Sequence, residues 1–131
     1  MKGYPPSVIA RLAGTDPERL RGQVGLADLD RVPLRRAPRW MVRTWRGDIA
    51  AMTMPWAVYV RPEVLFGDVG RLGALISHEL VHVRQWQEHG YWRFLSRYAA
   101  DYLRGRRAGL SHLEAYRSIG FEREAREISG A

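Results

Sequence analysis

From residue 68 onward, the hydrophobic positions recur every three or four residues, which is the period of an α-helix. Asp68 can cap the first of these helices, which we predict to run to about His89 with Gly90 at its end. A second helix is predicted over residues 91–104. Trp92, Leu95, Ala99 and Leu103 fall at helical spacing along it, and Phe94, Tyr98 and Tyr102 form a second, broad stripe.

Two shorter helices are predicted near the C-terminus. Ser111 and Glu114 have the spacing of a capping box, which opens a helix to about Ser118. Gly120 is expected to break this helix, and residues 121–128 are predicted to form the last one. Residues 68–128 should therefore be the helical part of the molecule.

The first 38 residues are punctuated by proline and glycine and are predicted to form an N-terminal arm of helical and irregular structure. One short helix is expected over residues 7–13. A second should start at the capping box of residues 15–18 and end at Gly22. Residues 23–38 are expected to be an irregular connection.

Residues 39–61 are rich in aromatic and β-branched side chains and predict short strands. The expected strands cover residues 40–45, 49–54 and 56–61, with a turn at Gly47-Asp48. Tight turns between short strands favour an antiparallel sheet. Strands followed by helices indicate the α+β class, and a length of 131 residues fits a single domain over residues 1–131.

The composition restricts the chemistry. There is no cysteine, so thiol catalysis, disulfides and cysteine-ligated metals are excluded, and any metal must be held by histidine or oxygen ligands. The net charge of +7 by itself suggests a nucleic-acid or membrane-surface partner. However, residues 48–90 carry three basic and five acidic side chains, so the charge lies in the flanking arms and favours acidic partners only as a surface property.

Neither a nucleic-acid partner nor a membrane span is expected from the sequence. The sequence contains no helix-turn-helix, zinc-finger or RNA-binding motif, so we do not expect a nucleic-acid partner. It also contains no secretory signal and no run of about 18 apolar residues, which predicts a cytoplasmic protein without a membrane span.

The strongest chemical signal is the sequence His78-Glu79-Leu80-Val81-His82, an H-E-x-x-H motif. Two histidines four residues apart share one face of a helix, so both imidazoles can reach one ion. Glu79 lies about 100° further round the helix. From there it can contact a metal-bound water as a general base without ligating the metal.

The motif resembles the zincin metallopeptidases, and the region 48–128 is similar to the minimal gluzincins. In that family a glutamate on a later helix, three positions before an alanine, completes the zinc site, which implies Glu122. Glu124 is the alternative ligand. The two glutamates lie about 200° apart round the helix, so they cannot both face the metal. The resemblance further implies a zincin-like fold, with a short antiparallel sheet on the motif helix. It implies that the strand at residues 56–60 is the sheet edge that pairs with an extended peptide.

We therefore expect a zinc-dependent metallopeptidase that hydrolyses a peptide or protein substrate. His78, His82 and Glu122 would hold Zn²⁺, and Glu79 would activate water. Tyr116 is our first choice for the donor to the oxyanion, ahead of Tyr102 and His112. Two alternatives stay open: a non-catalytic zinc domain with a structural or protein-interaction role, and a basic nucleic-acid-binding module.

Overall fold

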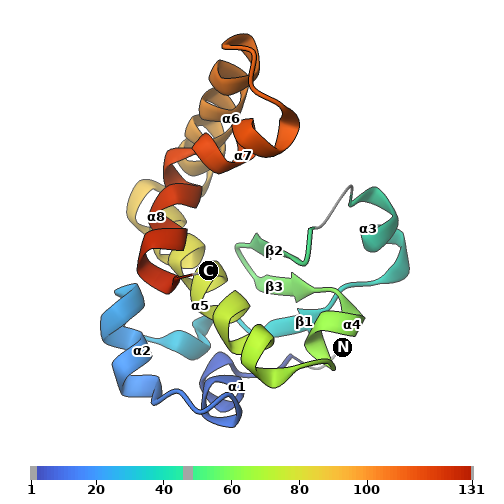
Figure 1. Ribbon diagram of the computed structural model, residues 1–131. Coiled ribbons are helices and arrows are strands. Elements are labelled where there is room, and N and C mark those ends of the chain that lie inside the picture. The colour runs from blue at the N-terminus through green and yellow to red at the C-terminus, as the bar shows by residue number, and fades with distance from the viewer. Residues whose placement is uncertain (1–2, 46–48, 131) are drawn as a thin grey trace.

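The computed structural model describes residues 3–45 and 49–130. Within these residues the protein is α+β, as predicted, with eight α-helices, one 3-10 helix and three strands (Figure 1). In chain order the elements are α1 (Pro6–Leu12), α2 (Pro17–Val24), η1 (Leu29–Arg31), β1 (Leu34–Arg36), α3 (Arg39–Thr44), β2 (Ala51–Met54), β3 (Ala57–Val60), α4 (Pro62–Leu65), α5 (Val69–His89), α6 (Tyr91–Arg107), α7 (His112–Ser118) and α8 (Gly120–Ser129).

The C-terminal helices follow their capping signals. The carboxylate of Asp68 accepts hydrogen bonds from the first backbone N–H groups of α5, and Gly90, with a φ of 82°, ends it. Both halves of the capping box between Ser111 and Glu114 are formed at α7. Gly120 differs from the prediction, because it is the first residue of α8 and its N–H is capped by the carboxylate of Asp101.

The N-terminal arm is more regular than predicted. Helices α1 and α2 are present, but α2 continues through Gly22 to Val24 and ends at Gly25, which has a φ of 80°. Such a left-handed conformation is open to glycine at little steric cost. The expected irregular connection at residues 23–38 contains η1 and the strand β1.

The sheet is mixed rather than purely antiparallel. Its strand order is β1-β3-β2, with β3 antiparallel to β2 but parallel to β1, where Leu34 pairs with Val58. The strand predicted at residues 40–45 is wrong, since this segment is the helix α3. Met41 and Trp45, one helical turn apart, are buried while Trp40 is exposed, so burial at helical spacing outweighs the strand preference of the individual residues. The turn predicted at Gly47-Asp48 lies outside the described residues.

Helix α5 is the centre of the molecule (Figure 1). Helices α1, α2 and α8 pack on it from one side and β2 from another, while α6 and α7 project beyond its C-terminal end. The main core joins the arm, the sheet and α5, and its fully buried members include Leu20, Val24, Leu34, Val58, Val60, Ile76, Leu80 and Val81. The middle and second half of α5, which carry the H-E-x-x-H motif, are thus held by contacts from both ends of the chain.

Candidate metal centre

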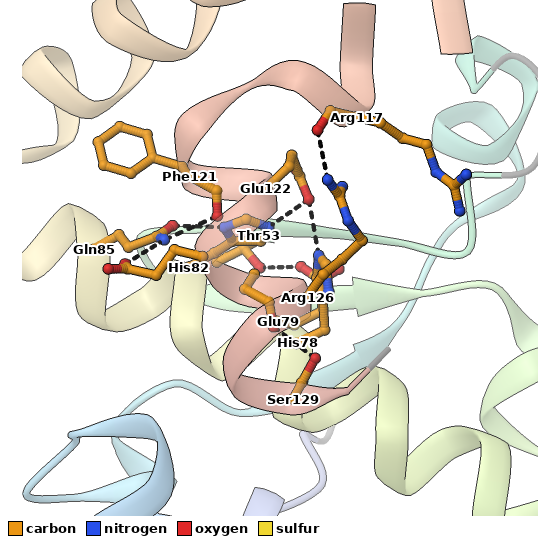
Figure 2. Close-up of polar contacts among 12 residues, drawn as sticks. Thr53, His78, Glu79, His82, Gln85, Arg117, Phe121, Glu122, Arg126 and Ser129 are labelled. Carbon is orange, nitrogen blue, oxygen red and sulfur yellow. Dashed lines mark hydrogen bonds and ion pairs between the residues drawn. The ribbon is translucent and has the colours of Figure 1, made fainter. Parts of the chain in front are cut away.

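His78, His82 and Glu122 converge where α5 crosses α8 (Figure 2). Nε2 of His78 lies 2.8 Å from Oε1 of Glu122, and Nε2 of His82 lies 3.2 Å from the same oxygen. One ligand atom from each of the three residues lies within 4.8 Å of the other two. The two imidazoles share one face of α5, as their four-residue spacing requires.

The packing of α8 on α5 places Glu122 at this point. Glu122 is in the first turn of α8, preceded by Phe121, whose ring stacks on Phe94 of α6 with 4.8 Å between centroids. One turn later Ala125 is fully buried against the core. These contacts fix both the depth and the rotation of α8, so the buried carboxylate faces the histidines.

Gln85 sets which ring nitrogen of neutral His82 carries the proton. It is fully buried on α5, and its Nε2 donates to the carbonyl of Phe121 at 3.0 Å and to Glu124 at 2.8 Å. Because both of these partners are acceptors, Oε1 of Gln85 must be the atom 2.8 Å from Nδ1 of His82. Nδ1 of His82 therefore donates to Gln85, and the lone pair of the neutral ring lies on Nε2, the atom that faces Glu122.

The three residues stabilise positive charge at the point where they meet. Burial opposes the charged form of His82, but the hydrogen bond to Glu122 and the carboxylates of Glu79 and Glu122 outweigh it and raise its pKa to about 9. The pKa of His78 is raised by the same partners. Burial acts to raise the pKa of Glu122, yet its hydrogen bonds with both histidines hold that pKa well below the usual range.

This donor set suits a divalent metal ion. A buried carboxylate at which two imidazole nitrogens converge is a stable arrangement only when cations compensate it, whether protons on the rings or a metal between the ligands. Two histidines and one carboxylate are a common protein ligand set of catalytic zinc, and they leave a fourth position open.

Glu79 lies beside the cluster without belonging to it. Its side chain is nearly buried, and its Oε2 accepts a hydrogen bond of 2.5 Å from Oγ1 of Thr53 on β2 (Figure 2). Thr53 thus holds the carboxylate toward the sheet, on the side where the site opens.

A cleft of about 270 Å³ opens onto this site. It runs between the edge strand β2 on one side and α6 on the other, and Tyr91 at the start of α6 reaches Met54 of β2 with its hydroxyl 3.8 Å from the sulfur. The lining is mostly apolar; it consists of Ile49, Ala51, Met52, Thr53, Met54, Glu79, His82, Tyr91, Phe94, Leu95, Tyr98, Tyr116 and Glu122.

The tyrosines divide into two groups. Tyr116, our expected oxyanion donor, lines the cleft, and burial followed by the charge of Glu122 raises its pKa. Tyr98 also lines it, and its hydroxyl donates to Oε2 of Glu122, which orients the carboxylate. Tyr102 and His112 are bonded to each other at 2.7 Å and are not part of the cleft, so the structure does not bring these two candidates to the site.

Glu124 faces away from the histidines, as its position on the helix predicts. It accepts hydrogen bonds from Gln85 and from Arg84, the latter at 2.9 Å. The amide of Gln85 lowers the pKa of the Glu124 carboxyl most, with Arg84 adding to the effect. Arg84 on α5 therefore links this helix to α8 through its ion pair with Glu124. Arg126 is likewise a packing residue, since it donates to the carbonyl of Arg117.

The strand beside the site is not the one expected. Residues 57–60 form β3, which lies between β1 and β2 and is therefore the centre of the sheet. The strand that borders the cleft is β2, with Met52, Thr53 and Met54 in the lining. Ala57, Val58 and Val60 are all buried, so β3 is buried on both faces as is typical of a central strand, whereas every residue of β2 is half-buried.

The sequence did not lead us to predict three residues of the site: Gln85, Tyr98 and Thr53. Gln85 carries a usable signal, because it follows His82 by three residues and so shares its helix face. Tyr98 belongs to the aromatic stripe of α6, which has the same pattern as ordinary core. No local pattern marks Thr53, whose role depends on how β2 meets α5.

No family model matches this chain, and the comparisons with curated proteins and with solved structures find no match either.

Proposed function

We propose that this protein is a zinc-dependent metallopeptidase of the gluzincin type. The observation that supports it most is the convergence of His78, His82 and Glu122, with Glu79 beside them in the lining of a cleft. An H-E-x-x-H motif by itself is a sequence pattern. Here its two histidines meet a carboxylate from 40 residues further along the chain, in a buried setting suited to a cation.

Each side chain then has a distinct task. A zinc ion held by these ligands supplies Lewis acidity, which polarises a substrate carbonyl and makes water more acidic. Glu79 accepts the proton of the attacking water and passes it to the leaving amine. Thr53 orients the Glu79 carboxylate through its hydroxyl, and Gln85 keeps the lone pair of His82 on the nitrogen that faces the site.

The surroundings of the site suit a polypeptide substrate. In the described part of the sheet, β2 pairs with β3 alone, so its outer backbone groups are open to an extended peptide. The cleft next to it is lined largely by apolar side chains such as Met52, Phe94 and Leu95, which suits an apolar substrate side chain. Tyr116, on the α7 side of the cleft, is the donor available to the developing oxyanion.

The test is hydrolysis of a quenched fluorescent peptide library by the zinc-loaded protein and by two variants. Glu79→Gln should keep the metal and lose at least about a hundredfold in rate, because it removes the general base. Glu88→Gln is the control, since Glu88 lies on the same helix, is exposed and, among the described residues, pairs only with Arg84. Glu88→Gln should retain the wild-type rate.

Two results would contradict the proposal. If Glu79→Gln hydrolyses peptides at the wild-type rate, Glu79 is not the base. If the wild-type protein binds zinc stoichiometrically and cleaves no library peptide, the metal has a structural role and the non-catalytic alternative replaces the enzyme.

A further inference from the structure

Helix α6 exposes an apolar face that no other element covers within the described residues. Its inner side packs on α7 and α8 through Phe94 and Gly105, which are both buried. On the outer side, Trp92 is 78% exposed, Leu103 51% and Leu95 36%. These positions, together with the exposed Ala99, recur at three- and four-residue spacing and form one continuous stripe; we call Trp92, Leu95, Ala99 and Leu103 the outer stripe of α6.

The outer stripe is bordered by arginine. Arg106 and Arg107 continue the stripe by one turn, and Arg93 follows Trp92 at its beginning. Arg93, Arg97 and Arg104 form a basic row further round the helix, as their spacing of four and seven residues requires. In this row Arg97 lies over the ring of Phe121 and Arg104 pairs with Asp101. Within the described residues, neither Arg93 nor Arg107 has a carboxylate partner, and Asp101 is the only acidic residue of this helix.

The position of α6 leaves this face accessible. Helices α6 and α7 project together beyond the end of α5, away from the sheet and the N-terminal arm (Figure 1). The outer stripe also reaches the cleft, because Leu95 belongs both to the stripe and to the lining. A surface that met the outer stripe would therefore lie next to the mouth of the cleft.

We propose that the outer stripe and its arginines dock α6 on an anionic lipid surface, with the helix lying in the plane of the membrane interface. A helix of 17 residues is about 25 Å long, and α6 combines tryptophan and leucine on one face with an excess of arginine beside it. Tryptophan is favoured at the headgroup level, and arginine can bury its aliphatic stem while its guanidinium stays among anionic headgroups.

The charge of the face argues against a second copy of this chain as the partner. Three arginines border or continue the stripe without a carboxylate partner in the described chain: Arg93, Arg106 and Arg107. A second copy of this chain would bring the same arginines into contact with one another, which is repulsive. Anionic headgroups complement all three at once. Among the described residues, no helix is both long and apolar enough to cross a membrane, so α6 would lie on the bilayer and not span it.

The first test measures co-sedimentation with vesicles of phosphatidylcholine alone and of phosphatidylcholine with phosphatidylglycerol. We expect binding to the anionic vesicles, at least about tenfold tighter than to the neutral ones. Trp92→Ser and Leu103→Ser should each weaken that binding about tenfold, because each removes a large apolar side chain from the interface. Trp40→Ser is the matched control, since Trp40 is 66% exposed but lies on α3, and it should bind like the wild type.

The second test separates a specific face from the overall charge. The double variant Arg93→Glu/Arg107→Glu and the control Arg36→Glu/Arg43→Glu change the net charge by the same amount, and all four arginines are exposed. The first should lose at least about tenfold in affinity for anionic vesicles, and the second should stay within about threefold of the wild type.

Three outcomes would overturn the lipid proposal: no binding to anionic vesicles, equal losses in the two double variants, or wild-type binding by both stripe variants. A dimer in sedimentation velocity that Trp92→Ser dissociates would also overturn it, in favour of self-association. The changed residues lie outside the metal cluster, so these results are independent of the proposed peptidase activity.

Discussion

The most informative perturbation of the site is at Gln85, which contacts no candidate substrate and holds the site together. Its fully buried amide accepts from His82 and donates to Phe121 and Glu124. Gln85→Met keeps the size of the side chain and removes all three bonds. The Nδ1–H of His82 and the carbonyl of Phe121 are then left buried without a partner, which should cost about 2–5 kcal/mol of stability in total.

The effect on zinc affinity should differ between two variants. Gln85→Met frees His82 to rotate and to change tautomer, so zinc affinity should fall about 10–100-fold, as is typical when the partner of a ligating histidine is lost. Gln85→Glu still accepts from His82 but loses its donors and faces the carboxylate of Glu124. It should therefore destabilise the fold to a similar extent, while keeping zinc affinity within about threefold of the wild type.

Two measurements separate these effects. Urea unfolding in the presence of a chelator gives the free energy of unfolding without metal, and competition with a fluorescent chelator gives the zinc Kd of the folded protein. Circular dichroism establishes that each variant is folded under the conditions of the competition. Zinc affinity in folded Gln85→Met equal to that of the wild type, or an equal loss in both variants, would refute the positioning role of Gln85.

Further predictions concern the carboxylate ligand and the N-terminal arm. Tyr98→Phe removes the hydroxyl that orients Glu122 and should weaken zinc binding about tenfold by chelator competition, whereas no loss would contradict that orienting role. Gly25→Ala places a methyl group 2.8 Å from Arg84 and should lower the urea midpoint more than Gly14→Ala, which has a similar φ in open space. Leu20→Ala should cost about 2–5 kcal/mol in urea unfolding; a smaller loss would show that the arm is not part of the main core.

The helical half of the fold was predictable because its signals are local. Asp68, Gly90 and the pair Ser111–Glu114 mark helix ends through hydrogen bonds made within a few residues, and the structure contains these caps. The region around the sheet was less predictable. The segment Arg39–Thr44 has the composition of a strand but forms a helix because Met41 and Trp45 reach a common small core, and that contact depends on distant residues such as Tyr59.

The strand β1 was missed for a related reason. It has three residues, two of them arginine, and its pairing with β3 is parallel, so its partner is more than 20 residues away. No turn signal joins such strands. The position of β3 at the centre of the sheet follows from β1, which is why the edge was assigned to the wrong strand.

The site shows the same division between local and distant information. The spacing of His78 and His82 and the opposite directions of Glu122 and Glu124 follow from helix geometry alone. The contacts of Thr53 and Tyr98 depend on where β2 and α6 lie relative to α5 and α8, which the sequence pattern does not encode.

The central claim is that His78, His82 and Glu122 bind one metal ion together while Glu79 does not. X-ray absorption at the zinc edge of the loaded protein, with metal content measured on the wild type, His82→Ala, Glu122→Ala and Glu79→Gln, tests it most directly. We predict one zinc per chain with two imidazole ligands in the wild type and in Glu79→Gln, and loss of the metal in the other two variants. Full zinc content in His82→Ala, or a spectrum without imidazole ligands, would contradict the claim.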